Sequence, residues 1–218
     1  MSAGILMMAR APRPGHVKTR LEPMLGPDGC ARLQRELIRY TAGWAAQCSR
    51  RAWLAFTPAD ARGEVAALIP PGVRLFPQEG DDLGERLRDA SELVFALHSG
   101  LWAVIGTDAP ELSSVHVRLA ERALASGRDV CLIPALDGGY ALIALARPVP
   151  AAFDLPTEAW GGPGVLELTL AALDGAGCSW VLLEPVRDLD TPEDARYIAA
   201  DPRCPAAVRE VLKQSSAA

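Results

Sequence analysis

Short apolar runs alternate with longer amphipathic segments along most of this chain. The runs typical of buried strands are residues 4–9, 51–57, 73–76, 101–106, 129–134 and 179–184, and residues 135–145 are typical of a turn that feeds a further strand. Apolar positions with helical spacing mark residues 27–48, 60–69, 83–97, 113–126 and 165–173, and one more helix is expected from Thr191. This alternation predicts an α/β fold with a mostly parallel, doubly wound sheet that is covered on both faces.

The most informative run is residues 101–106, which is followed closely by Asp108 and Pro110. Proline ends a strand ladder and restricts the residue before it, so Asp108 is expected at the carboxyl end of a central strand. Ligands of open α/β sheets bind at that edge. No lysine or arginine lies near Asp108 in the sequence, and such a carboxylate suits a divalent cation that accompanies a phosphate-bearing substrate. A residue that only caps the turn is the alternative.

A basic loop follows the first expected strand. Its prolines and glycine exclude helix and strand, and its cations are Arg10, Arg13, Lys18 and Arg20. Cations in this place are suited to binding phosphates, whereas a solvated basic loop is the simpler alternative. The loop is not a P-loop, because Val17 stands where that motif has glycine before the lysine.

A glycine-rich acidic loop leads into the helix expected at residues 83–97. Asp81 or Asp82 can cap that helix and complement its dipole. Capping does not explain Gly84, which costs about 1 kcal/mol relative to alanine inside a helix. A ligand or another stretch of backbone that passes close to Gly84 would explain it.

Two later segments offer binding surfaces. Asp137, Gly138 and Gly139 are typical of a hairpin turn, but their bare backbone could also lie against a sugar or nucleotide, with Asp137 bonding hydroxyl groups. Residues 148–163 carry four prolines and form a long irregular segment, typical of a lid or binding loop. Trp160 within it either stacks on a base or sugar ring or makes an anchoring hydrophobic contact.

The last expected helix begins with a clear acidic signal. Thr191 is suited to the N-cap, Pro192 to the first helical position, and Asp194 follows three residues after the cap. This leaves Asp188 and Asp190, two carboxylates at alternating positions, of which one is expected to face inward.

Composition narrows the class of protein. The 218 residues are 50% hydrophobic and suffice for one sizeable core. No run approaches the roughly 18 apolar residues of a membrane span, and the N-terminus lacks the order of a signal peptide. The five cysteines, at positions 30, 48, 131, 178 and 204, form no close pair. We expect a cytoplasmic protein, and its net charge of −5 favours neither a nucleic-acid nor a membrane partner.

Six segments in order and spacing resemble a bacterial family of predicted transferases. They are MARAPRPGHVKTRL, GDDLGERL, GTDAPEL, ALDGGYALIAL, WGGPGVLELT and DLDTPED. The family is known as radical-SAM/selenodomain-associated transferase 1, or DUF2064, and is linked by genome context to arsenosugar biosynthesis. The resemblance extends to about residue 198 and implies a single Rossmann-like α/β/α sandwich of the glycosyltransferase-A type, shared with nucleotidyltransferases. Residues 1–200 would form the nucleotide-binding domain, and residues 201–218 a terminal helix with a disordered end.

The resemblance also implies roles for individual residues. Arg10, Lys18 and Arg20 would contact phosphates, with Lys18, Arg20 and Asp108 as the catalytic candidates. Asp108 and Asp190 would hold Mg²⁺ or Mn²⁺. Glu85, Arg86, Asp137, Gly138, Gly139 and Tyr140 would line the acceptor or sugar side, where Trp160 is a further candidate. The sequence departs from the family pattern at Met8, Ile133, Pro134 and Ala144, positions that affect packing more than charge.

Three functions are compatible with these residues. The first is a metal-dependent glycosyltransferase that takes a nucleotide-diphosphate sugar and a small-molecule acceptor, although the central motif offers one aspartate rather than an Asp-x-Asp pair. The second is a nucleotidyltransferase that releases pyrophosphate, although the sequence lacks the Leu-x-x-Gly-x-x-x-Arg-x-Gly signature. The third is a nucleotide-binding regulator without turnover. The base, sugar, acceptor and oligomeric state stay open.

Two predictions concern the site directly. Asp108 and Asp190 should come together around one metal, because each follows an apolar strand, each precedes a proline within two residues, and neither has an adjacent cation in the sequence. Independent turn residues are the alternative. Lys18 and Arg20 should bind donor phosphates, each charge-assisted hydrogen bond contributing about 1.5 to 3 kcal/mol.

Overall fold

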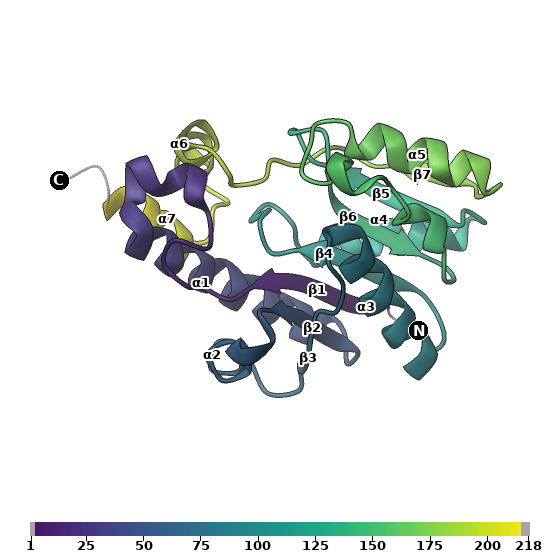
Figure 1. Ribbon diagram of the computed structural model, residues 1–218, viewed down its shortest axis with the longest axis horizontal. Coiled ribbons are helices and arrows are strands. Elements are labelled where there is room, and N and C mark those ends of the chain that lie inside the picture. The colour runs from purple at the N-terminus through teal and green to yellow at the C-terminus, as the bar shows by residue number, and fades with distance from the viewer. Residues whose placement is uncertain (1–2, 215–218) are drawn as a thin grey trace.

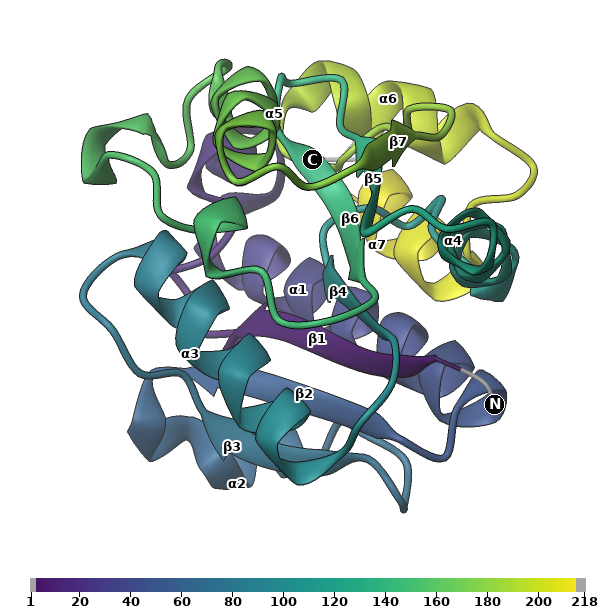
Figure 2. The same ribbon diagram turned by 90° about the vertical axis from the view of Figure 1, so that its right-hand side faces the viewer.

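The computed structural model describes residues 3–214. Seven strands form one sheet in the order β3-β2-β1-β4-β6-β5-β7 (Figure 2). Their bounds are Gly4–Arg10 (β1), Ala52–Thr57 (β2), Arg74–Pro77 (β3), Trp102–Gly106 (β4), Val130–Pro134 (β5), Tyr140–Leu145 (β6) and Trp180–Leu182 (β7). Strand β6 is antiparallel to β4 and β5, and the other neighbouring pairs are parallel. The predicted α/β fold with a mostly parallel sheet is confirmed.

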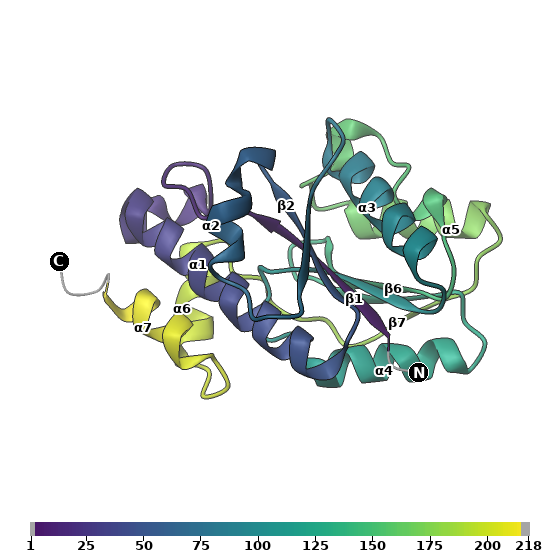
Figure 3. The ribbon, with the colours of Figure 1, turned by 90° about the horizontal axis from the view of Figure 1, so that it is seen from below.

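Helices cover both faces of this sheet (Figure 3). They are Glu22–Cys48 (α1), Arg62–Ala66 (α2), Leu83–Leu97 (α3), Ser114–Ala125 (α4), Val165–Gly175 (α5), Pro192–Ala200 (α6) and Ala206–Gln214 (α7). The side chains of β1 alternate between the two faces, as a strand requires. Ile5 and Met7 join the core beneath α1, α2 and α4, whereas Leu6 and Met8 join the core beneath α3 and α5.

Helices α1, α6 and α7 lie together at one end of the molecule (Figure 1), where they enclose a third apolar cluster. Leu33 and Leu37 of α1 pack there with Ile198 of α6 and with Val208 and Leu212 of α7. The expected terminal helix is therefore present, while the expected disordered end, residues 215–218, lies outside the described residues. No helix within residues 3–214 combines the length and the apolar character needed to cross a membrane.

Helix α1 contains the helix predicted at residues 27–48, which a short helical turn from Glu22 precedes across a kink at Gly26, where the backbone angles are non-helical. Two other predicted boundaries were wrong. The helix expected at residues 60–69 is a short 3₁₀ turn followed by the five-residue α2. Strand β7 has three residues rather than six, because it is an edge strand that soon meets Pro185, which has no N–H for a ladder.

Candidate functional site

A cleft of about 620 Å³ opens at the carboxyl ends of β1 and β4. Asp108 lies just past the end of β4, which is fourth among the seven strands of the sheet. The position predicted for this carboxylate is therefore confirmed. Among the residues singled out from the sequence, the wall includes Arg10, Lys18, Arg20, Arg86, Asp108, Asp137, Gly139, Tyr140, Trp160, Asp188 and Asp190, whereas Glu85 and Gly138 do not line it.

Lys18 and Asp108 form the central ion pair of this cleft. Lys18 Nζ lies 2.8 Å from Asp108 Oδ1, and the Lys18 side chain is 5% exposed against 53% for Asp108. The Lys18 backbone is left-handed, with φ of 52°, a conformation that is strained for a residue with a side chain. Strain of this kind persists only where the surroundings fix it, and it concentrates at functional sites.

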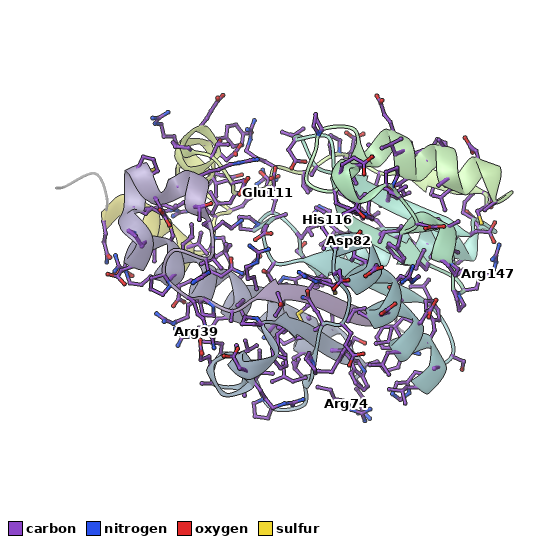
Figure 4. The ribbon with its side chains drawn as sticks, viewed as in Figure 1. Arg39, Arg74, Asp82, Glu111, His116 and Arg147 are labelled. Carbon is purple, nitrogen blue, oxygen red and sulfur yellow. The ribbon has the colours of Figure 1, made fainter. Side chains whose placement is uncertain are left out.

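A second ion pair joins Arg20 to Asp190 at 2.8 Å between Nη1 and Oδ2. The segment that carries Asp190 reaches the cleft because Leu189 N–H donates to the Asp108 carbonyl at 2.9 Å. Glu111 (Figure 4) also stabilises this segment, because its Oε2 accepts a hydrogen bond from Arg187 N at 3.0 Å. Two carboxylates that are remote in sequence thus come to one cleft.

Neither carboxylate has an adjacent cation along the chain, but Lys18 and Arg20 reach Asp108 and Asp190 through space. Both cations come from one loop after β1, so the pairing depends on how three loops meet at the edge of the sheet. Their predicted roles in binding phosphates, and a metal held jointly by the carboxylates, stay predictions.

Asp188 is the carboxylate of the cleft whose pKa is raised. Burial, followed by the charge of Asp137, raises its pKa from 3.8 to about 6. Lys18 opposes this shift only weakly, and Asp188 makes no ion pair with a described residue. A cation added to the cleft would relieve this penalty.

Two glutamines that sequence reasoning missed support the end of β1. Gln34, which is 3% exposed, donates through Nε2 to the Arg10 carbonyl at 3.2 Å and to Thr107 Oγ1 at 3.4 Å. Gln78 Nε2 donates to the carbonyl of Ala9 at 3.2 Å. Both line the cleft. The one available signal was a polar Gln34 beside the apolar stripe of α1.

The far wall begins at the start of α3 (Figure 4). Asp82, rather than Asp81, is the N-cap, and its Oδ1 accepts from Glu85 N at 2.9 Å. Its Oδ2 accepts a hydrogen bond from Thr157 Oγ1 at 2.6 Å. The bond from Thr157 and, after it, the bond from Glu85 N lower the pKa of Asp82. The Glu85 carboxylate accepts from Asp81 N at 2.8 Å, so it stabilises this turn rather than facing the cleft.

Residues 153–160 explain the glycine in the first turn of α3. A Cβ on Gly84 would lie 2.4 Å from Trp160 Nε1 and 2.6 Å from the Phe153 carbonyl. The predicted close approach at Gly84 is confirmed, and the approaching group is residues 153–160. Trp160 therefore makes an anchoring contact, and its indole nitrogen is buried without a hydrogen-bond partner among the described residues.

The turn between β5 and β6 meets the same segment. Strands β5 and β6 are antiparallel neighbours, so the hairpin prediction is confirmed. Gly138 has φ of 94°, and a Cβ there would lie 2.0 Å from the Pro163 carbonyl oxygen. Asp137 Oδ1 accepts from Gly139 N at 2.9 Å within the turn. Burial of the Tyr140 hydroxyl raises the Tyr140 pKa, so only the ring is open to the cleft.

Several carboxylates line this cleft, as a metal shared with a bound ligand would require. Within residues 3–214, no group of three or more His, Cys, Asp or Glu side chains is arranged to hold a metal ion. Mg²⁺ sites in enzymes of phosphate esters commonly use one or two carboxylates and take further oxygens from phosphates and water. Asp108, Asp188 and Asp190 all line the cleft, and burial is the main cause of the raised Asp188 pKa, so a metal shared between these carboxylates stays a prediction.

Comparisons with known proteins agree with this architecture. The sequence model of a family described as uncharacterized protein conserved in bacteria (DUF2064) matches residues 41–160. A crystal structure from Desulfovibrio desulfuricans G20, provisionally assigned as a nucleotide-diphospho-sugar transferase, has a TM-score of 0.85 and 28% identity, and the match covers 100% of this chain and 96% of that one. No curated protein matches the chain in sequence.

More distant structures share the fold. CMP:2-keto-3-deoxy-manno-octonic acid synthetase, solved with CTP, has a TM-score of 0.58 and 16% identity, with 98% of this chain and 99% of that one covered. A cytidylyltransferase from Leptospira borgpetersenii serovar Hardjo-bovis has a TM-score of 0.58 and 13% identity, with 99% and 95% covered. These two likenesses concern the fold alone.

Proposed function

The chain belongs to the DUF2064 family of uncharacterized bacterial proteins, and from this premise we propose that it is a transferase acting on a nucleotide-activated substrate, most simply a metal-dependent glycosyltransferase that uses a nucleotide-diphosphate sugar. One observation carries the proposal. The cleft brings Lys18 and Arg20 of one loop against Asp108 and Asp190. A diphosphate requires the cations, and a divalent metal requires the carboxylates. The assignment of the Desulfovibrio protein supports the choice of a sugar donor.

Each side of the cleft would have its own task. Lys18, Arg20 and Arg10 would bind the donor phosphates, and Asp108 with Asp188 or Asp190 would hold Mg²⁺ or Mn²⁺. The metal would neutralise the negative charge of the leaving diphosphate. The sugar or acceptor side would be lined by Arg86, Asp137, Gly139, Tyr140 and Trp160, all in the wall of the cleft. The acceptor would be a small molecule, because the cleft of about 620 Å³ must also hold the donor.

A nucleotidyltransferase is the second candidate. The observation that favours it is the pair of cations on a loop directly after the first strand, where they could stabilise a departing pyrophosphate. A nucleotide-binding regulator is the third candidate, and it would use the same cleft without turnover.

The binding test is a thermal-shift screen of nucleoside diphosphates, nucleoside triphosphates and nucleotide sugars, each with Mg²⁺, Mn²⁺ or EDTA. A tight ligand raises the melting temperature with the logarithm of its concentration over Kd. We expect stabilisation by nucleotides with metal and much less with EDTA. Asp108→Asn should abolish the metal-dependent part. The control Asp154→Asn changes an exposed carboxylate outside the cleft and should leave it intact. Failure of every nucleotide to stabilise the protein would refute the proposal.

Products then separate the candidates. A glycosyltransferase incubated with its donor and an acceptor, or water, releases a nucleoside diphosphate. A nucleotidyltransferase instead releases pyrophosphate from a triphosphate. Binding without either product identifies the regulator.

A further inference from the structure

The cations and carboxylates of the cleft are already paired with one another. Lys18 contacts Asp108, and Arg20 contacts Asp190, each pair at 2.8 Å. The groups suited to phosphate therefore neutralise the groups suited to metal. A ligand that engages one member of a pair therefore competes with the other member for its charge.

The Lys18 pair is the more firmly built of the two. Its side chain is 5% exposed, compared with 66% for Arg20. The Lys18 carbonyl accepts hydrogen bonds from Leu21 N at 2.8 Å and Cys30 Sγ at 3.2 Å, which hold the left-handed backbone in place. The surrounding fold thus holds Lys18 against Asp108, and the contact is not one between flexible surface side chains.

Charge balance then decides what can bind. A divalent cation alone on Asp108 would repel the Lys18 ammonium and weaken the contact that neutralises this buried charge, which is unfavourable. A diphosphate alone on Lys18 would draw that cation away from Asp108 and place negative charge beside the carboxylate. When both arrive together, Asp108 gains the metal, Lys18 gains a phosphate oxygen, and the metal and phosphate bind each other. Lys18 and Asp108 then both keep a partner of opposite charge.

We infer that the Lys18–Asp108 pair makes the cleft select the metal–diphosphate complex, binding the divalent cation and the diphosphate much more tightly together than either alone. The inference rests on the proposed function and specifies the form in which the donor is recognised. Without a ligand, Lys18 and Asp108 neutralise each other. Removal of Lys18 should therefore leave Asp108 able to bind the metal alone, and removal of Asp108 should leave Lys18 able to bind the diphosphate alone.

The experiment measures three affinities at constant ionic strength: Mn²⁺ alone, pyrophosphate in EDTA, and pyrophosphate with equimolar Mn²⁺. Pyrophosphate serves as a diphosphate without a base or sugar. In the wild type, the complex should bind more tightly than either component by about 5-fold to 150-fold, the usual range of coupling between two ligands. Lys18→Met should strengthen the binding of Mn²⁺ alone, because Asp108 is freed. Asp108→Asn should strengthen the binding of pyrophosphate in EDTA, because Lys18 is freed.

Matched controls separate this exchange from a general change in cleft charge. Arg10→Met removes a cleft cation that forms no ion pair with a described carboxylate, its contact being with the His16 carbonyl. Asp137→Asn removes a cleft carboxylate that accepts only a backbone hydrogen bond. Arg10→Met should strengthen Mn²⁺ binding less than Lys18→Met does, and Asp137→Asn should strengthen pyrophosphate binding less than Asp108→Asn does.

The outcomes distinguish this inference from the proposed function. If the wild type binds the complex but Lys18→Met and Asp108→Asn merely match their controls, the inference is overturned and the proposed function stands. If the wild type binds none of the three probes, the proposed function fails as well. Should Lys18→Met not fold, Lys18→Asn replaces it, because asparagine tolerates the left-handed backbone, and Asp108→Asn tests the other half independently.

Discussion

The two walls of the cleft are held together in opposite ways. On one wall, Lys18 and Arg20 meet Asp108 and Asp190 through ion pairs in which three of the four side chains are at least 33% exposed. On the other, Phe153, Trp160 and Pro163 lie so close to Gly84 and Gly138 that no side chain fits on these glycines. Ion pairs with exposed members contribute little stability, whereas closely packed contacts do not tolerate added atoms. One wall is suited to binding and the other to holding the shape of the cleft.

The strongest way to break this contrast is Gly138→Ala. The added Cβ would lie 2.0 Å from the Pro163 carbonyl oxygen at a residue with φ of 94°. Overpacking and a left-handed alanine together should lower the free energy of unfolding by about 3 kcal/mol or more. Urea denaturation measures this. The control Gly164→Ala, where nothing lies within 4 Å, should stay within about 1 kcal/mol of the wild type. Equal effects would contradict the account.

A smaller loss is expected from Gly84→Ala. Its Cβ would collide with the Trp160 indole and the Phe153 carbonyl, at a cost of about 1 to 3 kcal/mol in unfolding free energy. Trp160→Ala removes one of these obstacles. The double variant should therefore be more stable than the sum of the single changes by about 0.5 kcal/mol or more. Strict additivity in the double-mutant cycle would show that Trp160 does not rest on Gly84 in solution.

On the binding wall, by contrast, removal of the Asp188 charge should make the protein more stable. Because the folded-state pKa of Asp188 is raised from 3.8 to about 6, its ionisation costs the folded state nothing below pH 3.8, an increasing amount up to about pH 6 and a constant amount above that. Asp188→Asn should raise the unfolding free energy by about 1 to 2 kcal/mol at pH 8, after allowance for solvent screening, and much less at pH 4. An increase of the same size at both pH values would disprove this cause.

The smallest effect on stability is expected from Arg20→Gln. The Arg20 side chain is 66% exposed, so the loss of its ion pair with Asp190 should change the unfolding free energy by less than about 0.5 kcal/mol. Nucleotide affinity with Mn²⁺ should nevertheless fall. A variant that loses stability as strongly as Gly84→Ala would show that both walls serve the same structural purpose.

The sequence predicted those features that depend on local pattern. The strands were recognisable because Ile5, Leu6 and Met7 face two different cores and are all apolar. Asp108 was placed correctly because glycine and proline mark the strand end. Gly84 signalled a close approach, since an unfavourable helix residue needs a reason. That signal was correct, but it could not identify Trp160 as the approaching side chain.

The sequence could not predict how loops from separate strands meet. Nothing in the pattern joins Lys18 to Asp108, because the contact depends on the order β1-β4 in the sheet and on a left-handed residue that is not glycine. The buried hydrogen bonds of Gln34 were missed for the same reason. Periodicity alone also left open which of Asp188 and Asp190 faces inward, and the burial that raises the Asp188 pKa depends on the tertiary fold.

The central claim is that this cleft binds a divalent metal and a diphosphate together at Asp108. The most direct measurement is anomalous diffraction from crystals grown with Mn²⁺ and pyrophosphate. The account predicts a manganese peak about 2.1 Å from a carboxylate oxygen of Asp108 and from one of Asp188 or Asp190, with Lys18 Nζ moved from Asp108 to a phosphate oxygen. A manganese peak elsewhere, or pyrophosphate bound while Lys18 still pairs with Asp108, would contradict it.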